Sequence, residues 1–173
     1  EFGKTLAKKT AYGLKDISFD VCITSPLSRA KETARLILEG RDVLMLEDSR
    51  IMEMAFGSYE GKCLEKERQE VPEEFYRFFD DPEHFIPGEG GETFADVKKR
   101  AGEFLQDLYQ RREYEQSNIL ITTHGAALAG MLNYIKNAPL CAYWGQGVHK
   151  NCAVTEVQVT NGIPEILSEN VVY

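Results

Sequence analysis

The feature that most constrains the fold is an apolar run over residues 119–122, which ends shortly before His124-Gly125. The run predicts a buried strand, and the spacing of apolar residues up to residue 135 predicts a helix directly after it. A strand that passes into a helix is typical of α/β folds, which bind ligands at the carboxyl ends of their strands. His124 is therefore a candidate side chain at such an edge, although a lone histidine there is more often structural.

A second segment places a basic side chain in the same kind of position. The apolar residues Phe19 to Thr24 predict a strand, and Ser25-Pro26 and then Arg29 follow it. Taken alone, Ser25 and Pro26 are ordinary helix-capping residues, and Arg29 suits a solvated helix. Together with His124, however, Arg29 predicts a pocket for a phosphate.

The remaining pattern alternates helices and strands and ends in a hairpin. Thr93 and Asp96 form a capping pair before a long helix, and Asn161-Gly162 predicts a two-residue turn. We predict helices near residues 6–14, 27–37, 75–79, 94–108 and 127–135, strands at 19–24, 43–46 and 119–122, and hairpin strands at 153–159 and 163–167. The prediction is one α/β domain over residues 1–173, three-layered, with a mainly parallel sheet, helices on both faces and a C-terminal antiparallel hairpin added to that sheet.

Net charge and cysteine spacing limit the classes of ligand and partner that this chain can bind. The 173 residues carry a net charge of −8, which argues against nucleic acid and requires a local positive cluster for any phosphate. The four cysteines are scattered without zinc-site spacing, so we expect reduced thiols, no metal and a cytoplasmic protein. No apolar stretch is long enough to cross a membrane, and no feature specifies an oligomeric state.

Four segments in order resemble the histidine phosphatase superfamily, which includes the cofactor-dependent phosphoglycerate mutases. The resemblance covers nearly the whole chain. Its segments are Ser25-Pro26-Leu27-Ser28-Arg29-Ala30 with Thr33, residues 53–61 from Glu53 to Gly61, residues 87–97 with Gly90-Gly91-Glu92-Thr93, and Thr123-His124-Gly125.

The sequence departs from that family in one respect. The family's nucleophilic histidine lies in an Arg-His-Gly segment after the first strand, whereas His84, His124 and His149 follow Glu, Thr and Val. Residues 1–7 resemble the helix that comes after that segment. We therefore expect the opening strand and nucleophile loop to be missing, leave an N-terminal signal open, and expect these residues alone to lack phosphohistidine turnover.

The resemblance implies roles for three side chains. Arg29 and His124 would bind the transferring phosphate, and Glu53 would protonate the leaving oxygen, although spacing alone favours Glu53 as a surface loop residue. At the start of the helix that follows His124, the backbone N–H groups of Gly125 and Ala126 are suited to another phosphate oxygen. A carboxyl group acts as an acid near neutral pH only if burial or nearby negative charge raises its pKa, and phosphate would supply that charge.

Three other side chains near these segments are weaker candidates. Glu92 matches a family loop near the pocket and is assigned at most a supporting role. His84 lies in an acidic loop and is predicted to be solvated. His149 lies in a glycine-rich loop that could line the pocket mouth, although such a histidine is usually structural.

The leading function is a metal-independent phosphatase of small phosphate monoesters that needs no cofactor and works through a phosphohistidine. Its partner would be a small phosphorylated metabolite. A phosphoglycerate mutase is the first alternative, but it predicts longer insertions between the Glu53 segment and the Gly90-Gly91 loop. A non-catalytic phosphate-binding module is the second.

Overall fold

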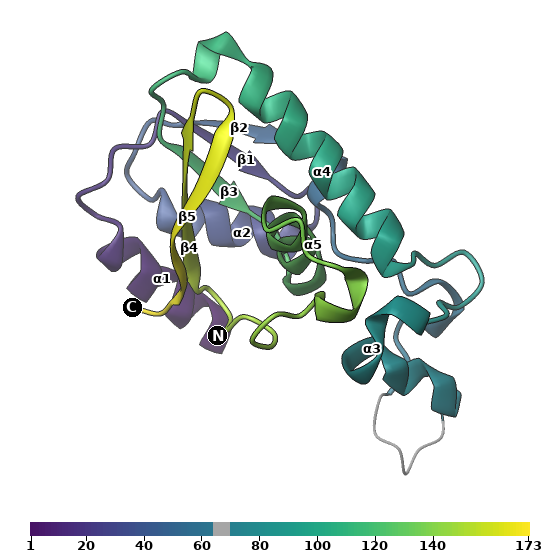
Figure 1. Cartoon of the computed structure of the whole chain (residues 1–173). Coiled ribbons are helices and arrows are strands. Elements are labelled where there is room, and N and C mark those ends of the chain that lie inside the picture. Colours follow the sequence, from purple (N-terminus) through teal and green to yellow (C-terminus); the bar gives the residue numbers. More distant parts are fainter. Residues whose placement is uncertain (64–69) are drawn as a thin grey trace.

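The centre of the fold is a parallel sheet with strand order β2-β1-β3, seen in a computed structural model that describes residues 1–63 and 70–173 (Figure 1). Its strands are β1 (Val21–Thr24), β2 (Leu44–Glu47) and β3 (Ile119–Thr122). Thr24 lies opposite Thr122 in the register, so β1 and β3 end side by side. The segments that follow these two strands therefore emerge at the same edge.

Helices cover both faces of this sheet because successive strand residues point to opposite sides. Cys22 and Leu120 pack on one face against α2 (Ser28–Ile37) and against Leu14, the C-cap of α1 (Phe2–Gly13). Ile23 packs on the other face with α4 (Phe94–Gln110) and α5 (Gly125–Ile135). The predicted three-layer α/β arrangement is confirmed.

The predicted helices are present, with shifted ends. The capping pair is confirmed: Thr93 Oγ1 accepts from the Asp96 N–H at 3.2 Å, and Asp96 Oδ2 accepts from the Thr93 N–H at 2.9 Å. The first strand starts at Val21, two residues after Phe19, and the Asp20 N–H just before it donates to the Asn118 carbonyl at 2.9 Å. Among the described residues, no helix is long and apolar enough to cross a bilayer.

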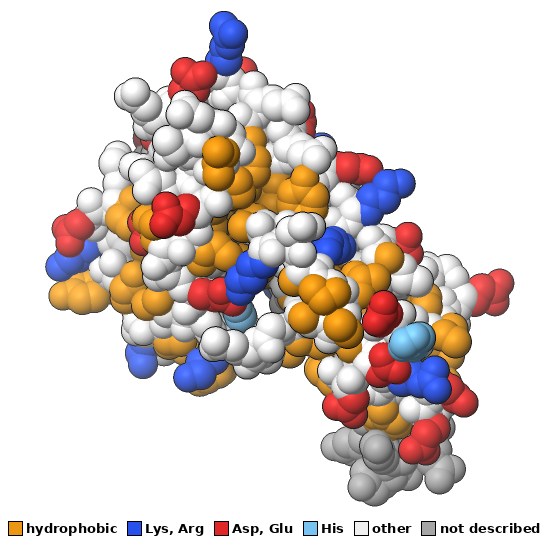
Figure 2. Space-filling view, in the orientation of Figure 1, with side chains coloured by type: hydrophobic (Ala, Val, Ile, Leu, Met, Phe, Trp, Pro, Cys, Tyr) orange, Lys and Arg blue, Asp and Glu red, His pale blue; other side chains and the backbone are white. Residues whose placement is uncertain are grey.

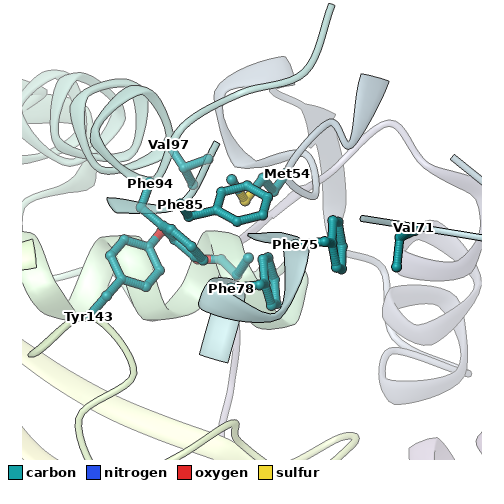
Figure 3. Close-up of a cluster of buried hydrophobic side chains, with 9 residues drawn as sticks. Met54, Val71, Phe75, Phe78, Phe85, Phe94, Val97 and Tyr143 are labelled. Atoms are coloured by element: carbon teal, nitrogen blue, oxygen red, sulfur yellow. The ribbon is translucent and has the colours of Figure 1, made fainter. Parts of the chain in front are cut away.

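The middle of the chain builds an aromatic lobe beside α4. Phe75 and Phe78 are buried with Phe85 and Phe94, as expected for core packing (Figure 3). Phe79, in contrast, is 51% exposed. Most of this lobe is short helical turns: η4 (Glu73–Tyr76), α3 (Arg77–Asp80) and η5 (Pro82–His84). Other 3-10 turns are η1 (Ser49–Ile51), η2 (Gly57–Tyr59), η6 (Arg112–Tyr114) and η7 (Leu140–Ala142).

The C-terminal hairpin is present, but its place in the sheet was predicted wrongly. Strands β4 (Val154–Thr160) and β5 (Ile163–Val171) pair antiparallel around Asn161 and Gly162, whose positive φ angles of 53° and 76° suit this turn. They form a separate two-stranded sheet instead of extending the parallel one. The hairpin is instead tied to α5 by the Lys136–Glu169 ion pair at 2.6 Å.

Candidate active site

Arg29 and His124 meet at the edge where β1 and β3 end. Arg29 lies in the first turn of α2, and its Nε–H donates to Nδ1 of His124 at 3.1 Å. His124 is the N-cap residue of α5 and is only 9% exposed, whereas Arg29 is exposed. Two residues separated by 95 positions are thus brought into contact by parallel strands.

The hydrogen bonds of His124 define its protonation. Because the Arg29 Nε–H can only donate, Nδ1 of His124 must accept, and Nε2 carries the proton that is donated to Ser25 Oγ at 2.8 Å. Burial, together with the positive charges of Arg29 and Arg100, lowers the His124 pKa to about 4. The imidazole is therefore neutral near pH 7, and it cannot take a proton from Ser25.

Ser25 binds His124 at this edge and is not the N-cap of α2, as was predicted for it. The helix begins at Ser28 with Leu27 as its N-cap, so Pro26 is not its first residue. The Ser25 hydroxyl is completely buried and accepts from the Leu27 N–H at 3.3 Å as well as from His124. Its place follows from the strand register, since the Ser25 N–H continues the β1–β3 ladder to the Thr122 carbonyl at 2.9 Å.

Glu53 reaches the same edge from the loop after η1. Its Oε1 accepts from three backbone N–H groups: Met54 at 3.0 Å, Ala126 at 3.1 Å and Ala127 at 3.3 Å. The last two belong to the first turn of α5, whose N–H groups have no partner within the helix. A carboxylate at a helix N-terminus also interacts favourably with the helix dipole.

This arrangement changes the expectation for the backbone of α5. The Ala126 N–H, predicted to bind phosphate, donates to Glu53, so a phosphate oxygen would have to share or displace that contact. A Cβ at Gly125 would lie 3.9 Å from Oε2 of Glu53 and 3.6 Å from Val148 Cγ1. The second carboxylate oxygen therefore faces the start of α5, close to His124.

The weaker candidates pair with side chains other than Arg29, His124 and Glu53. Glu92 binds Arg100 through both oxygens, at 2.7 and 3.0 Å, and its Oε2 also accepts from the Ala55 N–H. His84 is exposed and pairs with Asp81, which raises its pKa. His149 contacts Glu169 of β5 at 3.1 Å and lines the same small pocket as Gly125, against which its neighbour Val148 also lies.

Positive charge at this site is a local feature. On the face drawn in Figure 2, acidic and basic side chains are interspersed instead of forming one basic patch. Arg29 and Arg100 both act on His124 electrostatically, although the chain as a whole carries −8. An anion would be attracted here by specific side chains and not by the overall field.

Comparisons with known proteins show the family of this chain. The sequence pattern of the histidine phosphatase superfamily (branch 1) matches residues 1–172. The chain is 29% identical to phosphoserine phosphatase 1 of Hydrogenobacter thermophilus over 147 residues, covering 85% of this chain and 68% of that protein. It is 31% identical over 139 residues to the adenosylcobalamin/alpha-ribazole phosphatase of Escherichia coli, covering 80% and 67%. The structure of Bacillus stearothermophilus YhfR superimposes with a TM-score of 0.91 at 31% identity and covers 100% of this chain and 84% of its own.

Proposed function

The chain belongs to the histidine phosphatase superfamily, and on that premise we propose that the protein hydrolyses small phosphate monoesters through a phosphohistidine, without a metal. The observation that carries the proposal is the contact of Arg29 with His124 at 3.1 Å, beside the Glu53 carboxylate on α5. Similarity to two phosphatases of small phosphorylated molecules supports the substrate class.

Arg29 and His124 would stabilise the charge on the transferring phosphoryl group. The transition state spreads negative charge over the equatorial oxygens, and fixed positive groups aimed at them provide most of the catalysis. A bound phosphate dianion would favour protonation of His124. The charged imidazole would keep its Nε2–H bond to Ser25 and donate Nδ1–H to phosphate, while Arg29 turns its planar guanidinium onto the same group.

Glu53 would supply the proton for the leaving oxygen. Three N–H groups hold its Oε1, so Oε2, which faces Gly125, is the oxygen that would carry and deliver the proton. A positioned acid of this kind typically contributes about 10²- to 10⁴-fold to the rate.

The attacking group in this proposal is a histidine of the Arg-His-Gly type. The 173 residues contain no such segment, and His84 and His149 pair with Asp81 and Glu169 respectively. We therefore propose hydrolysis for a protein that carries such a segment together with these residues, and phosphate binding for the residues described. The same observation favours a phosphate-binding module without turnover as the second candidate.

Hydrolysis by the protein expressed from its complete reading frame separates these candidates. We expect release of phosphate from phosphoserine and from nitrophenyl phosphate, with an acid-labile phosphohistidine trapped during turnover. Phosphate binding without either signal would support the module. Movement of a phosphoryl group between the hydroxyls of phosphoglycerate would support a mutase instead.

A further inference from the structure

We infer that Arg100 is the positioning residue for Glu53: it fixes the backbone on both sides of that residue and thereby holds the carboxylate on α5. This inference deepens the proposed function, on which the acid role of Glu53 rests. Arg100 itself touches neither the Arg29 side chain nor the carboxylate of Glu53 through any hydrogen bond in the described part of the structure.

The guanidinium of Arg100 makes three hydrogen bonds to the backbone before and at Glu53. Nη1 donates to the carbonyls of Arg50 at 2.7 Å and Met52 at 2.8 Å, and Nη2 donates to the carbonyl of Glu53 at 3.3 Å. The Arg100 side chain is only 17% exposed, so these carbonyls are satisfied by the protein interior and not mainly by water. One side chain on α4 thus holds the whole turn that leads into Glu53.

A second arm of the same network fixes the residue after Met54. Arg100 binds both oxygens of Glu92, through Nε at 2.7 Å and Nη2 at 3.0 Å. Oε2 of Glu92 also accepts from the Ala55 N–H at 2.9 Å. The backbone is therefore held at Met52, Glu53 and Ala55, which leaves little freedom for the carboxylate between them.

This task requires arginine. A guanidinium offers five N–H donors in one plane, and here they serve three carbonyls and a bidentate carboxylate. A lysine ammonium keeps the charge but has three donors at one point and cannot span these partners. Arg100→Lys should therefore preserve the ion pair with Glu92 while releasing part of the Glu53 backbone.

Two backbone amides report directly on the position of Glu53. The N–H groups of Ala126 and Ala127 bond to Oε1 of Glu53, whereas the Leu128 N–H, one residue further, bonds to the His124 carbonyl at 2.8 Å within the helix. If Glu53 moves, exchange with solvent should accelerate at the first two amides and not at the third. A general loss of stability would accelerate all three.

The test is amide hydrogen exchange of the 173-residue chain, followed by NMR, with Glu53→Ala as the reference for a lost acceptor. In Arg100→Lys we expect exchange at Ala126 and Ala127 to rise at least about tenfold relative to Leu128. Arg111→Lys is the matched control, because the Arg111 side chain also pairs with a carboxylate of α4, Asp107, at 3.3 Å, but does so at the C-terminal end of that helix, outside the turn that leads into Glu53. It should leave that ratio unchanged.

Equal changes at the three amides, or no change, would overturn the inference. If Arg100→Lys does not fold, the test uses Glu92→Gln. This substitution weakens the ion pair between Arg100 and residue 92, so the exchange rates of Ala126 and Ala127 should again rise relative to that of Leu128. The assay needs no turnover, so its failure is separate from failure of the proposed function. In the complete protein, Arg100→Lys should also lower hydrolysis of alkyl phosphates more than that of nitrophenyl phosphate.

Discussion

The chemistry of each residue in the site follows from which of its atoms already have hydrogen-bond partners. His124 accepts from Arg29 at Nδ1 and donates to Ser25 at Nε2. Glu53 is held through Oε1, which directs Oε2 toward the start of α5. Arg29 is exposed, so its terminal nitrogens can meet an incoming anion.

Glu53→Gln should separate substrates by their leaving groups. The amide keeps the size of the side chain but has no proton to give, so hydrolysis of alkyl phosphates should fall strongly. Nitrophenyl phosphate needs scarcely any protonation of its leaving oxygen and should lose little. The measurement is kcat for both esters with the complete gene product. Equal losses on both, with folding intact by circular dichroism, would mean that Glu53 is not the acid.

His124 should make stability fall with acidity in a defined window. Its pKa is about 4 in the folded protein against 6.5 as the ordinary value, so the unfolded chain binds the proton more tightly. The free energy of unfolding is therefore not reduced by His124 above about pH 6.5. It decreases as the pH falls toward 4, by up to about 3 kcal/mol.

Chemical unfolding of the wild type and of His124→Gln, at about pH 7 and about pH 4.5, isolates this contribution from that of other titrating groups. The free energy of unfolding should drop more steeply in the wild type than in the variant. Parallel drops would show that burial does not depress the His124 pKa.

Among the elements, the parallel pair β1 and β3 determines how much of the site the sequence predicts. Arg29 and His124 follow apolar strands, and parallel strands end at one edge, so their proximity was predictable. Arg100 was missed because three of its partners are backbone carbonyls, which have no sequence signature. A usable signal existed, since Arg100 lies between Val97 and Phe104 on the apolar stripe of a helix.

The hairpin turn and the helix caps show which sequence patterns predict local structure correctly. The turn at Asn161-Gly162 and the capping box of α4 depend on short-range chemistry and were predicted correctly. The placement of the hairpin outside the parallel sheet depends on tertiary contacts such as Lys136 with Glu169. Ser25 was misassigned for the same reason, since its partner His124 is 99 residues away.

Thr93→Ala should destabilise the protein through α4 alone. The hydroxyl accepts from the Asp96 N–H, and loss of such an N-cap costs about 1 kcal/mol. Thr5→Ala is the control, because the Thr5 hydroxyl donates to the Glu1 carbonyl in the exposed first turn of α1. Urea unfolding should distinguish the two variants; equal stability of both would contradict the role of the cap.

On the scale of the whole molecule, a chain with a net charge of −8 is proposed to bind an anion through a few fixed groups. The sheet brings Arg29 and His124 together, while Arg100 of α4 holds the Glu53 loop against α5. The predicted α/β class with helices on both faces followed from periodicity in long segments.

Hydrolysis by the complete gene product should survive removal of metal ions. Arg29 and a protonated His124 would supply the positive charge that a metal supplies in other phosphatases. Activity after dialysis against a chelator should equal that before it. Loss of activity that Zn²⁺ or Mn²⁺ restores would favour a metal-dependent hydrolase.

The most direct test of the site is calorimetric titration of the 173-residue chain with inorganic phosphate. Arg29→Ala removes a charge-assisted contact worth about 1.5–3 kcal/mol, so the affinity should fall about ten- to a hundredfold. Arg35→Ala is the matched control, since Arg35 is exposed in the last turn of the same helix and should leave the affinity unchanged. Equal affinity of the wild type and Arg29→Ala, with folding intact, would contradict the assignment of this edge as the phosphate site.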